Sequence, residues 1–331
     1  MADKPLDRRT FLKLGIAAAA GGMAAASCRV PALSPAGSAY DPKGLPTRTL
    51  GRTGLSVPIL SLGAGSRFLT VKDPAKAEEI LRQALDNGVF YWDSADNYVA
   101  DGIFSEERLS VVLKDRRREV FLATKTHARD HDGVLRAVEE SLRRLGTDHI
   151  DLYQAHSIQT PAVVDEIGAP HGAWKALLRL REEKVVRFLG FSGHASAPAM
   201  AAMVRRFDFD NMLIALNHYE ERQGDLERDA VPAAAERGLG IAVIKVVRPR
   251  EKSNAVTPEE LIRYAWGLPH VVTAVIGMDS LAVLDEDIAL AKAYRPLDAD
   301  RAAGVRGVLD EVFGRGDLPW MQAGYHDGVR A

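Results

Sequence analysis

Short apolar runs rich in β-branched residues recur along most of this chain, and their regular spacing narrows the choice of fold sharply. Eight such runs begin near Ile59, Val89, Val120, Ile150, Val185, Met212, Ile241 and Val271. Consecutive runs begin about 26 to 35 residues apart, which is the length of one strand–helix unit. Stretches of helical period lie between them, such as residues 135–145, which end at Gly146. Eight such units predict a closed (β/α)₈ TIM barrel of the α/β class.

An open, doubly wound sheet is the main alternative to a closed barrel. No Gly-x-Gly-x-x-Gly run follows the first strand, which counts against a dinucleotide-binding domain of that kind. Residues 47–57 predict an N-terminal hairpin at the bottom of the barrel, and residues 281–293 and 300–313 predict two C-terminal helices. The barrel domain is therefore expected to span residues 47–331. Its last stretch, from residue 314, lacks periodicity and either folds over the barrel mouth or trails away.

The first 28 residues have the layout of an export signal rather than of a folded segment. The pair Arg8-Arg9 is followed by Phe11 and by a weakly apolar run from 16 to 26, too short to span a bilayer. This order resembles a twin-arginine signal, so the export machinery is an expected partner and the periplasm the expected location. Either Cys28 is lipidated, which would anchor the protein to a membrane, or the protein is released in soluble form. Residues 29–46 are rich in Pro, Ser, Gly and Ala and predict a flexible linker.

The overall composition excludes several classes of site. Lys and Arg number 43 against 45 Asp and Glu, so no nucleic-acid partner is expected. Cys28 is the only cysteine, which excludes an intramolecular disulfide, a cysteine-based zinc site and a self-contained iron–sulfur cluster. No metal site is expected.

Polar residues end three consecutive predicted strands. Asp93, Lys125 and His156 follow the second, third and fourth runs, and Tyr98 lies five residues beyond Asp93. Parallel strands of a barrel bring their carboxyl ends to one rim, so these side chains are expected to meet there. A nearby ammonium group would lower the pKa of the tyrosine, which could then protonate a carbonyl oxygen as a general acid. A hydride from a nicotinamide cofactor would complete a reduction.

These residues lie in motifs that resemble those of the aldo-keto reductase family over about residues 47–295. The motifs are Asp93-Ser94-Ala95-x-x-Tyr98, Ser105-Glu106-Glu107-x-Leu109, Ala123-Thr124-Lys125, Asp151-Leu152-Tyr153-x-x-His156, Gly190-Phe191-Ser192-Gly193 and Ile276-Gly277-Met278-x-Ser280. The resemblance implies the same barrel and a catalytic tetrad of Asp93, Tyr98, Lys125 and His156. Tyr98 would be the general acid and base, and the chain an oxidoreductase that interconverts carbonyls and alcohols with NAD(P)(H).

The resemblance also implies which residues hold the nicotinamide. Ser192 matches the family's serine after strand five, but Gly193 replaces the usual asparagine, and His194 is the candidate substitute. Asn217 stands near the position of a glutamine that binds the nicotinamide amide. Lys245 follows strand seven where an aromatic ring commonly stacks, so apolar contact is expected instead of stacking.

The other end of the cofactor would lie beyond the last strand. The run Gly277-Met278-Asp279-Ser280 places a carboxylate where a basic residue usually pairs with the 2′-phosphate, and Asp287 stands where an adenine contact is common. Asp279 favours NAD(H), since a carboxylate repels a phosphate and accepts hydrogen bonds from a ribose hydroxyl. The basic residues within 248–252 and the family habit favour NADP(H). Both cofactors remain candidates, with a slight preference for NADP(H).

The substrate is expected to be a small carbonyl compound or its alcohol. Ser157 follows His156, and the loop 157–172 is polar, which favours a hydroxylated, sugar-like substrate over a steroid. Two other functions stay open. One is a binding or regulatory protein that senses the nicotinamide redox state, and the other is an isomerase or lyase that uses the same lysine and histidine.

Overall fold

Eight parallel strands close into a barrel, in agreement with the spacing of the apolar runs. In the computed structural model the strand order around the ring is β10-β11-β12-β3-β4-β7-β8-β9, so neighbouring strands of the barrel follow one another along the chain. The strands are β3 (Leu60–Gly63), β4 (Tyr91–Asp93), β7 (Phe121–Thr126), β8 (Ile150–Ala155), β9 (Val186–Gly193), β10 (Asn211–Ala215), β11 (Gly240–Ile244) and β12 (Val271–Ile276). Each begins within two residues of its predicted start. The prediction of a (β/α)₈ barrel is confirmed, and the open sheet is excluded.

The structure describes residues 40–331 apart from 195, 221–226, 323, 326 and 328–331. The predicted export signal, residues 1–28, lies outside the described residues, as do residues 29–39 of the predicted linker. Among the residues that are described, no helix is both long enough and apolar enough to cross a membrane.

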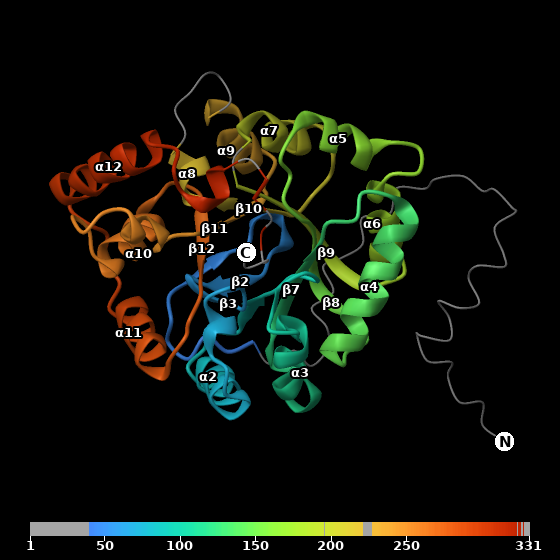
Figure 1. Ribbon diagram of the computed structural model, residues 1–331, viewed down its shortest axis with the longest axis horizontal. Coiled ribbons are helices and arrows are strands. Elements are labelled where there is room, and N and C mark those ends of the chain that lie inside the picture. The colour runs from blue at the N-terminus through green and yellow to red at the C-terminus, as the bar shows by residue number, and fades with distance from the viewer. Residues whose placement is uncertain (1–39, 195, 221–226, 323, 326, 328–331) are drawn as a thin grey trace, which may run out of the picture. The chain divides into compact units, whose positions relative to one another are not determined.

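Helices surround the strand ring, as Figure 1 shows from above. They are α2 (Pro74–Asp86), α3 (Ser105–Arg116), α4 (His131–Leu145), α5 (Pro161–Gly168), α6 (Ala173–Glu182), α7 (Ala197–Arg206), α8 (Leu216–Glu220), α9 (Glu227–Glu236), α10 (Pro258–Gly267), α11 (Leu281–Lys292) and α12 (Ala299–Gly314). α5 is an extra helix within the loop 157–172 that follows β8. The predicted helices over 281–293 and 300–313 correspond to α11 and α12.

Local sequence explains where these helices begin and end. In α4 the side chain of Asp130 accepts a hydrogen bond from the backbone N–H of Gly133, and Gly146 ends the helix with a φ of 65°. Its buried side chains, among them Val138, Leu142 and Leu145, recur at helical spacing and face the barrel. In α10, Thr257 and Glu260 form a reciprocal capping box.

The predicted hairpin covers the bottom of the barrel. β1 (Thr47–Thr49) pairs antiparallel with β2 (Ser56–Pro58), and the turn η2 (Gly51–Thr53) joins them. The backbone N–H of Arg52 donates to the carbonyl of Gly238, just before β11 begins. A Cβ at Gly51 would lie 2.2 Å from that same carbonyl oxygen, so only glycine allows this approach. The opposite rim, at the carboxyl ends of the strands, is left to form the barrel mouth.

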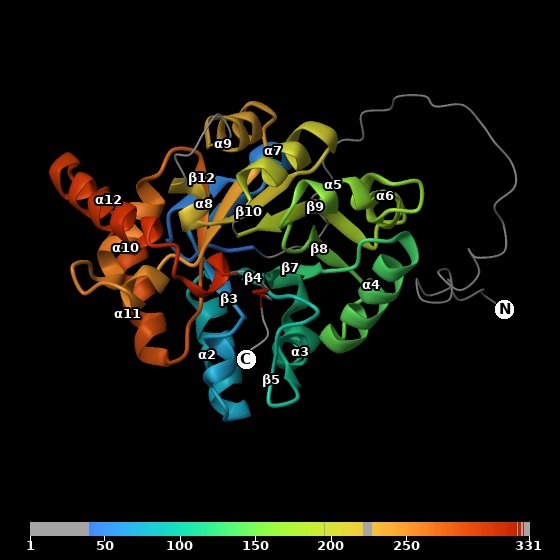
Figure 2. The ribbon, with the colours of Figure 1, turned by 45° about the horizontal axis from the view of Figure 1, so that its top comes forward.

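The chain after α12 returns to the mouth instead of trailing away. Figure 1 shows the red C-terminal segment running from α12 to the centre of the strand ring, and Figure 2 shows it from a second angle. Trp320 of its short helix η6 (Pro319–Met321) and the preceding Leu318 are buried against side chains of β10, β11 and β12. The apolar contact area of these two residues stabilises the docking of the tail.

Candidate active site

Three neighbouring strands bring an aspartate, a lysine and a histidine to the mouth. Asp93 ends β4, Lys125 is the fifth residue of β7, and His156 directly follows β8. All three side chains are buried. The Nζ atom of Lys125 lies 2.6 Å from Oδ2 of Asp93 and 2.6 Å from the carbonyl oxygen of Ser94. Both partners accept hydrogen bonds from Nζ and so hold the end of the lysine side chain at a fixed position.

Tyr98 lies above this pair, in the turn that follows β4. Its hydroxyl oxygen is 3.5 Å from Nζ of Lys125, and the ammonium group lies 4.8 Å from the centre of the ring. The ring packs on Gly65, where an added Cβ would come within 3.1 Å of it. The side-chain amide of Gln154 donates to Oδ1 of Asp93 at 3.1 Å and so helps to hold this carboxylate in place. The sequence did not predict this contact. The structure thus brings together the four residues predicted to form the catalytic tetrad.

A fifth group, Asp327 from the C-terminal tail, meets the tetrad at its centre. The hydroxyl of Tyr98 donates to Oδ2 of Asp327 at 2.8 Å, and Nε2 of His156 lies 3.1 Å from the same oxygen. The other oxygen, Oδ1, is 2.7 Å from Nζ of Lys245 and 2.6 Å from the hydroxyl of Tyr325. Sequence reasoning did not single out Asp327, since no local pattern marks it.

The pKa of Tyr98 departs from the expectation. Burial of the hydroxyl and the negative charge of Asp327 raise this pKa well above its usual value. The expectation that Lys125 lowers the pKa of Tyr98 is therefore wrong for this arrangement, in which the tyrosine is a protonated donor. Burial also opposes ionisation of Asp327, but Lys245 and the neighbouring histidines hold the pKa of its carboxyl well below the usual range.

His156 is a neutral hydrogen-bond donor. Burial lowers its pKa well below the usual value, and hydrogen bonding to Asp327 offsets this only in part. Since the ionised Asp327 has no proton to give, the contact between them requires the hydrogen to be on Nε2 of His156. His194 is also buried, and its pKa is likewise lowered by burial. Its Nε2 lies 3.4 Å from Asp327.

The residues expected to bind the nicotinamide lie on the same rim. Ser192 is buried, and its hydroxyl accepts the backbone N–H of Ser157 at 3.0 Å. At Gly193 an added Cβ would lie 2.3 Å from Sδ of Met200, so a larger residue there would require the Met200 side chain to move. Its neighbour His194 instead extends a side chain into the mouth.

Asn217 and Lys245 are engaged by the tail. Nδ2 of Asn217 donates to the carbonyl of His194 at 3.1 Å, and its Oδ1 accepts the indole N–H of Trp320 at 2.6 Å. Lys245 has a φ of 63° and bonds both Asp327 and Tyr325. The tail thus takes up hydrogen-bonding groups that the resemblance assigned to the nicotinamide.

The residues expected at the other end of the cofactor lie in the loop between β12 and α11 and, for Asp287, within α11. Asp279 pairs with Arg67 at 2.9 Å, so its negative charge is partly balanced. Ser280 caps α11 by accepting the N–H of Val283, and an added Cβ at Gly277 would lie 2.8 Å from Cβ of Arg67. Burial raises the pKa of Asp287 to about 7.

The basic residues after β11 have acidic or polar partners of their own. Arg248 pairs with Glu251 at 2.7 Å, and Lys252 pairs with Asp317 at 3.2 Å. Arg250 bonds Asn254 and the carbonyl of Ser253. These contacts favour the interpretation that residues 248–252 form a solvated, charged surface.

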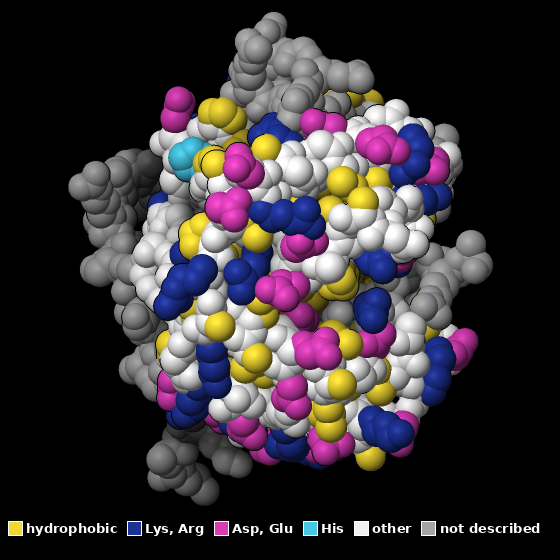
Figure 3. Space-filling model, turned by 90° about the vertical axis from the view of Figure 1, so that its left-hand side faces the viewer, with side chains coloured by type: hydrophobic (Ala, Val, Ile, Leu, Met, Phe, Trp, Pro, Cys, Tyr) yellow, Lys and Arg dark blue, Asp and Glu magenta, His cyan; other side chains and the backbone are white. Residues whose placement is uncertain are grey.

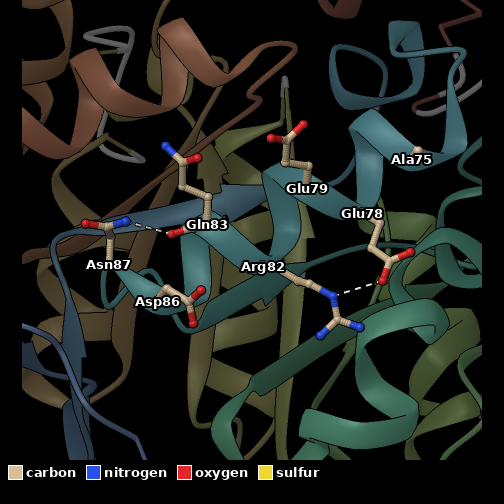
Figure 4. Close-up of a pocket in the computed structure, with 7 residues that line it drawn as sticks. All are labelled: Ala75, Glu78, Glu79, Arg82, Gln83, Asp86 and Asn87. Carbon is tan, nitrogen blue, oxygen red and sulfur yellow. Dashed lines mark hydrogen bonds and ion pairs between the residues drawn. The ribbon is translucent and has the colours of Figure 1, made fainter.

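Two further features are a surface hollow away from the tetrad and a group of possible metal ligands that includes His156. A surface hollow of about 500 Å³ runs along α2, lined by Ala75, Glu78, Glu79, Arg82, Gln83, Asp86 and Asn87, and contains none of the predicted site residues (Figure 4). Asp96, His127 and His156 offer ligand atoms within 4.8 Å of one another, a grouping that sequence spacing did not reveal. The expected absence of a metal site stays a prediction.

Comparison with known proteins identifies the family. The model of the aldo/keto reductase family matches residues 60–249, more than half of the chain. The chain belongs to this family of oxidoreductases. An uncharacterised oxidoreductase of Bacillus subtilis is 33% identical over 215 residues, which are 58% of this chain and 63% of that protein. A D-threo-aldose 1-dehydrogenase of a Pseudomonas species is 29% identical over 65% of this chain and 73% of its own length. L-galactose dehydrogenase of Arabidopsis thaliana is 24% identical, with coverage of 80% and 94%.

Solved structures show the same barrel. The holo form of an aldo-keto reductase from Bacillus halodurans has a TM-score of 0.65 at 22% identity and covers 80% of this chain and 96% of its own. A related protein from Pseudomonas aeruginosa has a TM-score of 0.61 at 27% identity, with coverage of 74% and 94%.

A nicotinamide dinucleotide is the cofactor that this family generally uses, and the residues at the mouth fit one. Oδ2 of Asp287 is buried and has no hydrogen-bond partner among the described residues, as expected of an atom that accepts a hydrogen bond from a bound ligand. The buried amide of Asn217 and the hydroxyl of Ser192 are suitable partners for a nicotinamide amide. In this structure Oδ1 of Asn217 accepts the indole N–H of Trp320.

Proposed function

We propose that the protein interconverts a hydroxylated, sugar-like aldehyde or ketone and its alcohol, with NADP(H) or NAD(H) and with Tyr98 as the general acid and base. One observation carries this proposal: the hydroxyl of Tyr98 and Nε2 of His156 converge on a single oxygen atom, at 2.8 and 3.1 Å. Two donors aimed at one oxygen form a site for a carbonyl oxygen on which negative charge develops. Asp327 provides that oxygen in the structure.

Each member of the tetrad has a separate task in this mechanism. His156, neutral because it is buried, donates through Nε2 and orients the carbonyl. Tyr98 gives its proton to the oxygen, and Lys125 stabilises the phenolate that remains, 3.5 Å away. Asp93 and the carbonyl of Ser94 hold Lys125 in place. In the reverse direction the phenolate accepts the proton of the alcohol.

The cofactor supplies or accepts the hydride when it is bound. Ser192, His194 and Asn217 would hold the nicotinamide end, and Lys245 would lie beside it. Gly277, Asp279, Ser280 and Asp287 would hold the ribose and adenine end.

The sugar-like substrate is supported by the polar loop after β8 and by the names of two relatives. D-threo-aldose 1-dehydrogenase and L-galactose dehydrogenase both act on sugars by their names. Turnover of sugar-like carbonyls but not of steroids is the expected result, and the opposite preference would contradict this part of the proposal.

Binding of the cofactor is tested by titrating the protein with NADPH and with NADH while Trp fluorescence is followed. Tight binding of either one supports the proposal, and binding of neither contradicts it. The ratio of the two affinities shows which charge governs the choice of cofactor at the ribose. A preference for NADH indicates the carboxylate of Asp279, and a preference for NADPH indicates the guanidinium group of its partner Arg67.

We also propose that the protein is exported to the periplasm through Arg8-Arg9 and that residues 1–28 are its signal. This rests on the sequence alone. Replacement of both arginines by lysine should leave the protein in the cytoplasm, and unchanged export of that variant would contradict the proposal.

The described surface agrees with a small-molecule substrate. On the face in Figure 3, basic and acidic side chains are interspersed and form no large field of one sign. A polyanion is held by such a field. The expected absence of a nucleic-acid partner remains a proposal.

A further inference from the structure

The main chain of Asp327 makes a contact that the tetrad does not account for. The side-chain amide of Asn97 donates to the backbone carbonyl oxygen of Asp327 at 2.5 Å. The hydroxyl of Tyr98 and Nε2 of His156 contact Oδ2 of the same residue at 2.8 and 3.1 Å. Three side chains of the barrel thus bind two oxygens of a single residue of the tail.

The carbon skeleton of an aspartate joins these two oxygens. Oδ2 is attached to Cγ, and the backbone oxygen is attached to the third carbon beyond it, along Cγ–Cβ–Cα–C. In the proposed mechanism, Oδ2 occupies the place of the substrate's carbonyl oxygen. A substrate's carbonyl carbon would then lie near Cγ, and an oxygen on the third carbon beyond it would reach Asn97. Asp327 itself shows that a chain of this length connects the tetrad with Asn97.

Asn97 lies on a different side of the mouth from Lys245. It belongs to the turn after β4, next to Tyr98, whereas Lys245 follows β11. β12 and β3 separate those two strands along the shorter path around the ring. Lys245 binds the other carboxylate oxygen of Asp327, Oδ1. A substrate that extends toward Asn97 therefore leaves the residues proposed for the nicotinamide end to the cofactor.

The chemistry of the Asn97 amide favours a hydroxyl group on the substrate. A side-chain amide has N–H donors and an oxygen acceptor, and a hydroxyl group can accept from the one and donate to the other. The backbone carbonyl of Asp327 only accepts, and Oδ1 of Asn97 has no hydrogen-bond partner among the described residues. A hydroxyl group in the same place would use both the donor and the acceptor. An ether oxygen would use only the donor, and a methyl group would use neither.

We propose that Asn97 determines specificity by binding a hydroxyl group on the third carbon beyond the substrate's carbonyl carbon. The substrate class is then an open-chain γ-hydroxy aldehyde or ketone, which includes sugars with a hydroxyl group at that position. This proposal rests on the proposed function. In the reduction the carbonyl carbon gains a hydride from NAD(P)H, which is oxidised, and the carbonyl oxygen gains the proton of Tyr98. The γ-hydroxyl group keeps its bonds and orients the chain.

Ratios between two ligands remove the effect of the docked tail. The tail occupies the place of any such ligand, so its docking lowers all their apparent affinities by one common factor. Asn97→Leu also removes a hydrogen bond to the tail, and that change too is common to all ligands. The affinity ratio between a ligand with the hydroxyl group and its analogue without it therefore measures the contact with Asn97.

The first measurement is binding of 4-hydroxybutanamide and of butanamide to the whole protein, followed by ligand-observed NMR titration. Both have an amide carbonyl that the hydride does not reduce, and they differ only in the γ-hydroxyl group. We expect the wild type to bind the hydroxy compound about five- to tenfold more tightly, and Asn97→Leu to bind the two within about twofold. Asn254→Leu, at an exposed position, is the matched control and should keep the wild-type ratio. The same ratio in the wild type and in Asn97→Leu would overturn the proposal.

The second measurement compares kcat/KM for 5-hydroxy-2-pentanone, 5-methoxy-2-pentanone and 2-pentanone. We expect the hydroxy ketone to be the best substrate of the wild type, and its advantage over 2-pentanone to disappear in Asn97→Leu. Asn97→Asp can accept from a hydroxyl group but cannot donate, so it should keep a preference for the hydroxy ketone and lose any for the methoxy ketone. A preference for the hydroxy ketone that survives in Asn97→Leu would assign the hydroxyl group to another residue and overturn the proposal.

The spacing is tested with 4-hydroxy-2-butanone, in which one carbon fewer separates the hydroxyl group from the carbonyl. Its advantage over 2-butanone should be smaller than that of 5-hydroxy-2-pentanone over 2-pentanone, and it should not depend on Asn97. An equal, Asn97-dependent advantage would overturn the assignment of the hydroxyl group to the third carbon.

The two measurements separate this proposal from the proposed function. Equal reduction of the hydroxy ketone and 2-pentanone overturns the γ-hydroxy proposal and leaves the reductase standing. Failure to reduce any carbonyl, together with an Asn97-dependent preference for 4-hydroxybutanamide, supports the hydroxyl site and contradicts the reductase.

Discussion

The hydroxyl of Tyr98 donates to Oδ2 of Asp327 across 229 residues of sequence, at a distance of 2.8 Å. The residue predicted to do the chemistry is thus bound by the protein's own C-terminal tail. Because His156 contacts the same oxygen, the tail occupies the position proposed for the substrate carbonyl. In the proposed mechanism, Asp327 must therefore leave this position before a substrate carbonyl can occupy it.

Tyr98→Phe should lower kcat/KM by about 10² to 10⁴, because the variant has no proton to give to the carbonyl oxygen. Initial rates of NAD(P)H oxidation with a reactive aldehyde measure this loss. Cofactor affinity, followed by Trp fluorescence, should stay within about twofold, since the phenol donates to the substrate and not to the cofactor.

Tyr294→Phe is the matched control for this variant. Tyr294 packs against Trp266 on the flank of the barrel, away from the tetrad, and its replacement should leave kcat/KM unchanged. Equal activity of Tyr98→Phe and the wild type would remove Tyr98 from the mechanism.

The free energy of unfolding should fall as the pH drops below about 6.5, the usual pKa of histidine. His156 and His194 have pKa values lowered by burial, so below that pH the unfolded chain binds protons that the folded protein does not. Each of them contributes up to about 1.4 kcal/mol per pH unit over this range. The contribution is complete above pH 6.5 and is lost as the pH falls through the folded pKa.

Urea unfolding at pH 5, 6, 7 and 8 measures this dependence. His194→Gln should make the dependence on pH less steep, whereas His149→Gln, a change at a half-exposed side chain, should not. A free energy of unfolding that is constant from pH 5 to 8 would contradict the prediction.

The barrel and the meeting of the four tetrad residues were predictable because both follow from local, repeated signals. Strand runs set the spacing, and a parallel barrel brings every strand end to one rim, so Asp93, Lys125 and His156 had to meet. The hairpin under the barrel follows in the same way from the turn at residues 51–54 and the strands around it.

The tail was not predictable in this way. Trp320 bonds Asn217, 103 residues away, and the side chain of Asp327 contacts barrel residues 82 to 229 positions away. These contacts depend on the shape of the finished mouth, and the sequence after residue 314 has no period that marks them. The expectation for the pKa of Tyr98 failed because burial of the hydroxyl raises this pKa, and the charge of Asp327, which comes from the tail, raises it further.

Trp320→Ala should free Asn217 and so tighten cofactor binding, while it lowers the stability of the protein. The indole is 2% exposed and packs on the barrel strands, so its loss should cost about 3 to 5 kcal/mol. The N–H that bonds Oδ1 of Asn217 is lost as well, which leaves that oxygen for a nicotinamide amide. Calorimetric titration with NADPH and a thermal melt measure the two effects. A weaker affinity for both cofactors would show that Trp320 supports the cofactor site instead of blocking it.

Gly193→Ala should destabilise the protein by about 1 to 3 kcal/mol, because the new methyl group overlaps Sδ of Met200. Met200→Ala should relieve that overlap, so the double variant should be more stable than the sum of the two single changes implies. Gly307→Ala is the control: it lies within α12 with open space around it, and alanine there should add about 0.5 to 1 kcal/mol. Denaturant unfolding of the four variants gives the comparison, and an additive double variant would exclude Met200 as the reason for the glycine.

Asp287→Asn should stabilise the protein more at pH 8 than at pH 5. Burial raises the pKa of Asp287 to about 7, so the folded protein holds a proton there that the unfolded chain has released above about pH 4. Its favourable contribution is complete below the unfolded pKa and is lost as the pH rises through 7. The neutral amide avoids that loss, and the gain at pH 8 should reach at most about 4 kcal/mol.

Urea unfolding of Asp287→Asn at pH 5 and pH 8 tests this, with Glu236→Gln, at an exposed position in α9, as the control. A saturating nicotinamide dinucleotide should raise the free energy of unfolding of the wild type at pH 8, because an adenine amino group would donate to the buried Oδ2. The difference in stability between Asp287→Asn and the wild type at pH 8 should therefore become smaller. A gain that is the same at both pH values would show that Asp287 is ionised in the folded protein, and would remove the reason to place the adenine there.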